Sequence, residues 1–228
     1  MEARAAGNGA APPGAGGGES AGSGAGVRAG SVGRGDGDAP LHVFAYGSLI
    51  WRPGFPFEHR EPAVLRGRHR ALCVLSHHHR GTPERPGLVL GLDRGGACRG
   101  VLYRVAAAHR AEVLAYLRAR EQVTGVYREV TAPVSRLDGS RAEALAYVVD
   151  RRHAQYARRL PLDALLAHVR QGRGISGANV DYVRSTYESL SALGVADRTL
   201  ARLVEALGAG SDGDAGGTSA GGAGAGKA

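Results

Sequence analysis

One acidic residue stands at a position where a structural helix would carry an apolar one. Glu121 lies four residues after Leu117 and seven after Leu114, so helical spacing places its carboxylate on the apolar side of a helix expected over residues 108–121. The sequence "EQVTG" indicates that the helix ends at Glu121, where the helix dipole also disfavours an acid. Such a carboxylate must be paired, or be partly desolvated with a raised pKa. Glu121 is therefore a candidate general base, and a salt bridge to an arginine of the sheet is the structural alternative.

The stretch "VFAYGSLI", residues 43–50, runs from an apolar strand directly into residues that suit turns and polar contacts. Two interpretations fit Tyr46, Gly47 and Ser48: a ligand-binding turn with exposed backbone, and a plain hairpin turn. The Ser48 hydroxyl lacks the nucleophile-elbow pattern G-x-S-x-G, because Leu49 and Ile50 follow it.

Other residues with reactive side chains carry less information. His77, His78 and His79 are consecutive, so their side chains point in different directions, and we expect a polar loop and no metal site. The metal motifs CxxC and HExxH are absent from the sequence, and no phosphate-loop motif GxxxxGK follows an expected strand. Cys73 and Cys98 lie in apolar, strand-like segments and are expected to be buried free thiols, which fits a reducing compartment.

Composition separates the ends of the chain from its middle. Residues 1–40 hold 13 of the 37 glycines, and residues 208–228 hold 9 more, with no aromatic residue in either segment. Such segments cannot bury enough apolar surface to offset chain entropy, so both are expected to be disordered tails around one folded domain, 41–207. The N-terminus lacks an apolar signal region and no run of about 18 apolar residues occurs, which predicts a soluble, cytoplasmic protein without a membrane partner.

The charge of the chain is carried by arginine. The net charge is +8, each tail contributes −1, and the folded part is therefore +10 (8 plus 1 plus 1). Lys227 is the only lysine, and the arginines form no run and no basic helix face. An Arg-rich nucleic-acid-binding module is one interpretation, but the sequence lacks the aromatic platforms and motifs that such modules use. A pocket for a small anion would use the same charge, and we expect no nucleic-acid partner.

The pattern of apolar residues predicts strands first, with one inserted helix, and then helices. After the first strand we expect extended chain over 63–76 with a bend or bulge at Gly67, and a hairpin that turns at "RGGA", residues 94–97. A second hairpin is expected at Asp138-Gly139. Three helices follow, the first between Pro161 and Gly172, the others capped by Asn179 and Asp197. This order predicts an α+β fold: a small mixed or antiparallel sheet, curled into a partial barrel, with helices on one side.

Five stretches occur in order between about Leu41 and Leu207: "VFAYGSLIW", "HRGTPERPGLVLGL", "GVLYRV", "YLRAREQVTGVYREV" and "SGANVDYVRSTYESLSALGVAD". Together they resemble the ChaC family, the glutathione-specific γ-glutamylcyclotransferases. The resemblance implies a γ-glutamylcyclotransferase-like fold, a small mixed β-barrel with packed helices. It also implies cleavage of glutathione to 5-oxoproline and Cys-Gly without a metal or organic cofactor. A cyclotransferase for another γ-glutamyl amine or peptide is the alternative.

The resemblance further implies roles for individual residues. The family's catalytic acid corresponds to Glu121, and its substrate-cradling turn corresponds to Ala45, Tyr46, Gly47, Ser48, Leu49 and Ile50. Ala45 departs from the family pattern, which usually has a second glycine there, so the turn is expected to differ slightly in geometry. Glutathione carries two carboxylates, and we expect Arg80 in "HRGTP" to bind one of them.

Overall fold

The computed structural model describes residues 39–209. Nearly all of the expected tails, residues 1–38 and 210–228, lie outside this range. The prediction that the tails are disordered therefore concerns residues outside the described part of the chain. The last helix continues to Ala209, past Leu207 where we expected the folded part to end. Within 39–209, none of the helices combines the length and the apolar character that crossing a membrane requires.

Five strands close into a barrel in the order β1-β3-β2-β4-β5. Neighbouring strands are antiparallel except β1 and β5, which pair in parallel. The α+β class and the mixed sheet are thus confirmed, and the barrel is closed where we expected a partial one. The strands are β1 (Leu41–Ala45), β2 (His59–Ser76), β3 (Gly87–Val105), β4 (Tyr127–Arg136) and β5 (Arg141–Val149).

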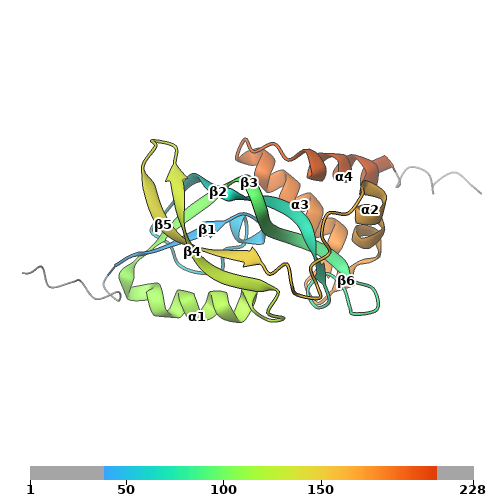
Figure 1. Cartoon of the computed structure of the whole chain (residues 1–228), viewed down its shortest axis with the longest axis horizontal. Coiled ribbons are helices and arrows are strands. Elements are labelled where there is room, and N and C mark those ends of the chain that lie inside the picture. Colours follow the sequence, from blue (N-terminus) through green and yellow to red (C-terminus); the bar gives the residue numbers. More distant parts are fainter. Residues whose placement is uncertain (1–38, 210–228) are drawn as a thin grey trace, which may run out of the picture. The chain divides into compact units, whose positions relative to one another are not determined.

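The helices cover different sides of this barrel. Figure 1 shows α1 along one side, while α2, α3 and α4 gather around the far end of the long β2–β3 ribbon. We expected all helices on one side of a sheet, but the whole outer surface of a closed barrel is available for packing. The α-helices are α1 (Arg110–Glu121), α2 (Leu162–Gln171), α3 (Asn179–Ala192) and α4 (Arg198–Ala209); two 3₁₀ turns are η1 (Ser48–Ile50) and η2 (Ala107–His109), and a two-residue pair is β6 (Arg173–Gly174) with β7 (Gly177–Ala178).

The hairpin predicted at "RGGA" is wrong. Gly87–Val105 is one continuous strand that pairs with β2 along its length. Gly95 and Gly96 have φ of 93° and 68°, and they lie across the ribbon from Gly67, whose φ is 76° and where the register shifts. These three glycines form a bulge that bends the ribbon without reversing the chain. The bulge expected at Gly67 is confirmed.

Several other local predictions are confirmed. Gly139, with φ of 85°, lies in the turn that joins β4 to β5. Asp197 caps α4, since its Oδ1 accepts two backbone N–H groups of the first turn at 3.1 Å each. Cys73 and Cys98 are buried free cysteines.

Asn179 has a different role from the predicted one. The residue is the first of α3, and its fully buried side chain does not cap the helix. Its Oδ1 accepts the Leu88 N–H at 2.6 Å, and its Nδ2 donates to the Leu88 carbonyl at 2.8 Å. Strand β1 pairs only with the far end of β3, so this edge of β3 needs another partner for its buried backbone groups. Asn179 supplies that partner and ties α3 to the barrel.

We expect Asn179→Leu to lower the free energy of unfolding by about 2 kcal/mol or more, because both Leu88 groups would be left buried without hydrogen bonds. Urea denaturation followed by circular dichroism measures this change. Glu188→Ala, an exposed position on the same helix, is the matched control and should leave the unfolding midpoint unchanged. Equal stability of the two variants would contradict the assigned role.

Candidate active site

A pocket of about 470 Å³ opens where the turn after β1, the β2–β3 turn, the end of α1 and the start of α3 meet. Most of the predicted site residues line it: Tyr46, Gly47, Ser48, Leu49, Arg80 and Glu121. Ala45 and Ile50 do not line it; their side chains belong to the core, with 0% and 5% exposed. The fold therefore brings together residues that are up to 75 positions apart in the sequence (121 minus 46).

Ala45 occupies ordinary strand backbone. It is the last residue of β1, pairs with Val101, and has no positive φ. A residue with a Cβ fits this conformation without strain. The backbone of β1 approaches the backbone of β3 closely at Gly100, where a Cβ would lie 2.3 Å from the Ala45 carbonyl oxygen. The glycine that this contact requires is Gly100.

The turn after β1 presents backbone to the pocket. Gly47 has φ of −133° and ψ of −132°, and its carbonyl accepts the Ile50 N–H at 2.9 Å, which starts η1. Among the hydrogen bonds of residues 39–209, none uses the N–H of Ser48 or of Leu49. The interpretation of this turn as a plain hairpin turn is wrong, because β1 pairs with β3 and β5 and not with the next strand, β2. This turn offers donors to whatever enters the pocket.

Glu121 is the last residue of α1, as the sequence predicted, and its side chain is 16% exposed. Its one ion pair in the described chain is with its neighbour Arg120, whose Nε lies 3.2 Å from Oε1, and not with an arginine of the sheet. Burial raises the pKa of the Glu121 carboxyl above its ordinary value, and Arg120 offsets part of that rise. A carboxylate of this kind can accept and return a proton nearer neutral pH than an exposed one.

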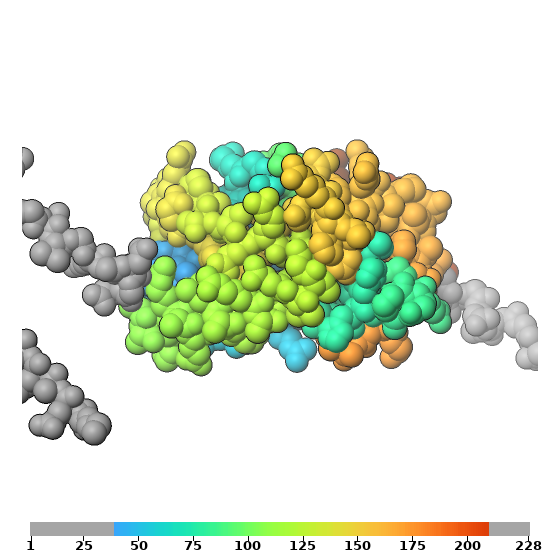
Figure 2. Space-filling view, turned by 60° about the horizontal axis from the view of Figure 1, so that its bottom comes forward, coloured from blue at the N-terminus to red at the C-terminus, as the bar shows by residue number. Residues whose placement is uncertain are grey.

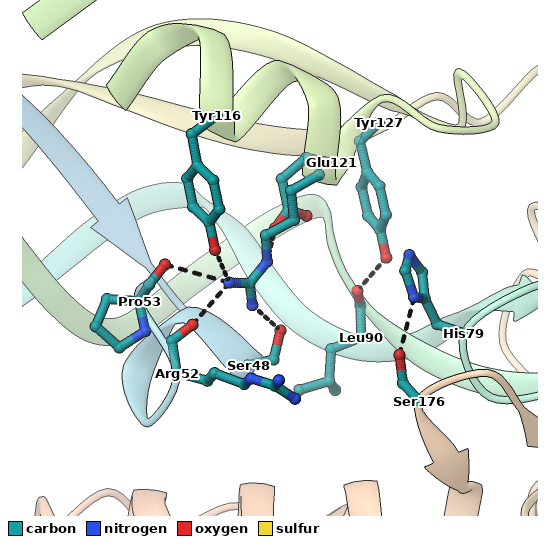
Figure 3. Close-up of polar contacts among 10 residues, drawn as sticks. Ser48, Arg52, Pro53, His79, Leu90, Tyr116, Glu121, Tyr127 and Ser176 are labelled. Carbon is teal, nitrogen blue, oxygen red and sulfur yellow. Dashed lines mark hydrogen bonds and ion pairs between the residues drawn. The ribbon is translucent and has the colours of Figure 1, made fainter. Parts of the chain in front are cut away.

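Arg120 connects the end of α1 to the turn; Figure 3 shows Ser48, Arg52 and Tyr116, its hydrogen-bond partners, close to Glu121. Its guanidinium donates to the Ser48 hydroxyl at 3.0 Å, to the Tyr116 hydroxyl at 2.8 Å and to the Arg52 carbonyl at 2.7 Å. The same group forms the ion pair with Glu121, so one side chain holds the acid and the turn in a common frame. Sequence analysis missed Arg120; its position beside Glu121 and four residues after Tyr116 was the available sign.

Three tyrosines form a wall of the pocket: Tyr46 and Tyr182 are buried, and Tyr127 is partly buried. The Tyr127 hydroxyl donates to the Leu90 carbonyl at 2.6 Å, and the Tyr182 hydroxyl accepts the Leu90 N–H at 3.1 Å. Burial raises the pKa of Tyr182 to about 12, and raises the pKa of Tyr46 and of Tyr127 well above the usual value. The wall is therefore neutral at physiological pH. Tyr46 was among the predicted site residues, but Tyr127 and Tyr182 were not singled out from the sequence, although Tyr182 shares the apolar face of its helix with Val183.

Arg80 borders the pocket on the side of α3. Its guanidinium donates to the Ala178 carbonyl at 3.1 Å and lies 5.4 Å from the centre of the Tyr182 ring. Nearby, the His79 ring and the Ser176 hydroxyl share a hydrogen bond of 3.0 Å, which joins the β2–β3 turn to the β6–β7 turn. Figure 2 shows these segments beside each other on the face that also carries α1. No group of three His, Cys, Asp or Glu side chains suited to a metal occurs within residues 39–209.

Comparison with known proteins assigns the chain to a family. The family model described as ChaC-like protein matches residues 41–209. The chain belongs to the ChaC-like family. This match covers the barrel and all four α-helices, so the resemblance carried by the five sequence stretches is confirmed.

Relatives of this ChaC-like chain include named enzymes. It is 32% identical over 167 residues to the glutathione-specific γ-glutamylcyclotransferase of Escherichia coli, which covers 73% of this chain and 72% of that protein. It is 34% identical over 182 residues to glutathione-specific γ-glutamylcyclotransferase 1 of Homo sapiens, which covers 77% and 82% of the two chains. A crystal structure of a yeast γ-glutamylcyclotransferase specific to glutathione has the same fold, with a TM-score of 0.69 at 22% identity over 75% of this chain and 96% of that one.

We expect the carboxyl of Glu121 to titrate above the ordinary range for glutamate, and Arg120→Gln to raise its pKa further by removing the one adjacent cation. Carboxyl-carbon NMR of the folded protein across a pH series measures both values. Arg118→Gln on the same helix is the matched control, because Arg118 lowers the pKa of Glu129 through their hydrogen bonds and does not pair with Glu121. An ordinary pKa for Glu121 in the unmodified chain would contradict the burial argument.

Proposed function

We propose that this ChaC-like protein is a γ-glutamylcyclotransferase that cleaves glutathione to 5-oxoproline and Cys-Gly. The observation that carries the proposal is the partly desolvated Glu121 carboxylate, in the same pocket as a turn whose amides are unoccupied in the described chain. An acid with a raised pKa beside free N–H donors suits a reaction that moves a proton while charge develops on a carbonyl oxygen. The named relatives act on the same substrate by their names.

The proposed reaction begins at the substrate's α-amino group. At neutral pH this group is an ammonium ion, and Glu121 removes one proton to give the nucleophilic amine. The amine attacks the γ-carbonyl carbon of the same molecule and closes a five-membered ring. The attacking nitrogen then carries two protons, and the lactam keeps one of them. Collapse of the tetrahedral intermediate breaks the bond to the Cys nitrogen. Glu121 returns its proton to that leaving nitrogen, which also receives the surplus proton of the ring nitrogen and departs as the ammonium form of Cys-Gly. Because nucleophile and carbonyl belong to one substrate, holding them in the ring-closing geometry supplies an entropic advantage.

The turn after β1 is proposed to stabilise the developing oxyanion. The Ser48 and Leu49 N–H groups are held by η1, and Arg120 fixes the Ser48 hydroxyl at 3.0 Å. Donors that are already oriented need no reorganisation as the negative charge forms. The neutral tyrosine wall keeps water away from the ring-closing atoms without adding a competing charge. These steps use proton transfer and hydrogen bonding by the chain's own residues.

Arg80 is proposed to bind one substrate carboxylate. It lines the pocket, and burial lowers the pKa of its guanidinium, which an anionic ligand would counteract by pairing with the charge.

We also propose a cytoplasmic location, supported by the two free buried cysteines of the described chain.

We expect Glu121→Gln to reduce release of 5-oxoproline from glutathione by about 10²- to 10⁴-fold, because the amide cannot accept the ammonium proton. Chromatographic assay of 5-oxoproline and Cys-Gly measures this loss. Glu112→Gln is the matched control: Glu112 is on the same helix with 75% of its side chain exposed and should keep full activity. Equal product release from the Glu121 variant and the unmodified protein would show that Glu121 is not the base. If neither protein cleaves glutathione, a panel of other γ-glutamyl amines and peptides tests the alternative substrates.

The same variant should be no less stable than the natural chain at neutral pH. A carboxyl whose pKa is raised by folding binds more protons in the folded than in the unfolded state, so its contribution to stability decreases as pH rises through the raised pKa. Below the ordinary glutamate pKa of about 4.3, both states are protonated and the difference between Glu and Gln should vanish. Thermal unfolding at several pH values measures this, and it separates loss of chemistry from loss of fold.

We expect Gly47→Ala to fold normally but to raise the KM for glutathione by about tenfold or more. A Cβ there would lie 3.6 Å from the Tyr182 hydroxyl and 3.7 Å from a Leu90 methyl, which is ordinary contact. The methyl group would occupy space beside the turn amides and displace the substrate carbonyl. Steady-state kinetics with a thermal-unfolding control is the test. An unchanged KM would mean that the substrate does not approach this turn.

A further inference from the structure

A second cavity, of about 970 Å³, lies on the barrel and shares no lining residue with the first pocket. It is formed by the middle of β2 and β3, by β4 and β5, and by the segment that follows β5. We call this cavity the arginine basin, because half of its fourteen lining residues are arginines. They are Arg68, Arg94, Arg128, Arg151, Arg152, Arg158 and Arg159. Arginines that are scattered along the sequence are thus gathered on one surface by the fold.

The positive charge of the basin is not balanced by the acidic residues that line it. Asp93 and Asp150 are its only acids, so seven arginines against two aspartates leave five positive charges. Asp93 is already engaged, since it accepts the Tyr156 hydroxyl at 2.6 Å and pairs with Arg151 at 3.4 Å. In the part of the chain that the structure describes, Arg151 is the one basin arginine with a carboxylate within ion-pair distance. The other six guanidinium groups remain available to a ligand.

Two features of the basin are unfavourable for the fold by itself. Arg68 and Arg94 are direct cross-strand partners in the β2–β3 ladder, and like charges placed opposite each other repel. Arg158 has φ of 61° and is the one non-glycine residue with positive φ among residues 39–209. Such conformations persist where the surrounding structure enforces them, and they cluster at ligand sites. A general preference for arginine over lysine explains the residue type but neither of these placements.

The backbone under the basin is shaped by the glycine bulge. Gly67 precedes Arg68, and Gly95 follows Arg94, so the bulge bends the ribbon at the basin arginines. A Cβ at Gly67 or Gly95 would meet nothing within 4 Å, so neither glycine is needed for space. Their positive φ is the property that requires glycine.

We propose that the arginine basin binds a small ligand that carries several adjacent phosphate groups. The guanidinium fork matches the oxygens of phosphate in a two-bond geometry, and a chain of phosphates concentrates the negative charge that five uncompensated cations require. The cavity is within the size range of small-molecule sites. A nucleic-acid strand is disfavoured, because stacked bases need free aromatic faces. Of the two aromatic rings that line the basin, His69 and Tyr156, the larger one is covered by Arg151 at 5.5 Å.

The test uses the full chain and inorganic triphosphate, with ATP as a second probe, in isothermal titration calorimetry with a metal chelator present. We expect saturable binding with one ligand per chain, and a loss of affinity of at least tenfold in the triple variant Arg94→Gln/Arg128→Gln/Arg159→Gln. ATP with the affinity of triphosphate would mean that the basin recognises only the phosphate chain, and tighter ATP binding would add a contact with the nucleoside. Either result supports the proposal.

The matched control is Arg66→Gln/Arg99→Gln/Arg202→Gln, which removes the same charge from exposed arginines that line neither cavity. It should change the affinity less than about threefold. Equal weakening in the two triple variants, or equally effective competition by sulfate at the same ionic strength, would reduce the binding to general charge attraction and overturn the proposal. Loss of binding in Arg80→Gln would place the anion in the first pocket and also overturn it.

If the basin triple variant fails to fold, Arg158→Gly provides the measurement. Glycine accepts φ of 61° without strain, so this variant should be at least as stable as the natural chain while it loses one phosphate contact. We expect its affinity for triphosphate to fall severalfold. Unchanged affinity in this variant would overturn the proposal.

Discussion

The structure depends on keeping one carboxylate partly out of water without neutralising it. Glu121 lies at the C-terminal end of α1, where burial and the helix dipole both act against a negative charge. A single adjacent cation, Arg120, offsets part of this cost. Arg118, which donates two hydrogen bonds to Glu129, lowers the pKa of that carboxyl. A partner of this kind at Glu121 would remove the raised pKa that suits it to proton transfer.

Arg120 links the Glu121 carboxylate to the turn after β1, so the positions of the two depend on each other. Because its guanidinium contacts Ser48, Tyr116 and the backbone at Arg52, a shift at the end of α1 would also displace the turn. The barrel provides the rigid reference, since β1 is hydrogen-bonded on both sides and its last residue leads directly into the turn. The site is thus built on the end of a strand and the end of a helix, where side-chain positions are better defined than in loops.

The two cavities differ in the number and sign of the charged side chains that line them. In the first pocket, neutral tyrosines surround one partly buried acid and a few cations, Arg80 and Arg120 among them, which suits a ligand that is to be chemically changed. In the arginine basin, the charges are numerous and mostly positive, which suits binding and electrostatic attraction. The net charge of the sequence is shared between these roles in a way that composition could not reveal.

The sequence alone was sufficient for the α+β class, the end of α1 at Glu121, the Gly67 bulge and most strand positions, because these follow from local periodicity, turn chemistry and the misfit of one acid. It predicted a hairpin at "RGGA" and a capping role for Asn179, since a local pattern cannot show that Gly95 and Gly96 face Gly67, or that Leu88 needs a partner. Only the tertiary structure decided that Arg120 connects acid and turn, that Ala45 and Ile50 belong to the core, and that seven arginines share one surface. These are contacts between distant segments, and their energies depend on the closed barrel that brings the segments together.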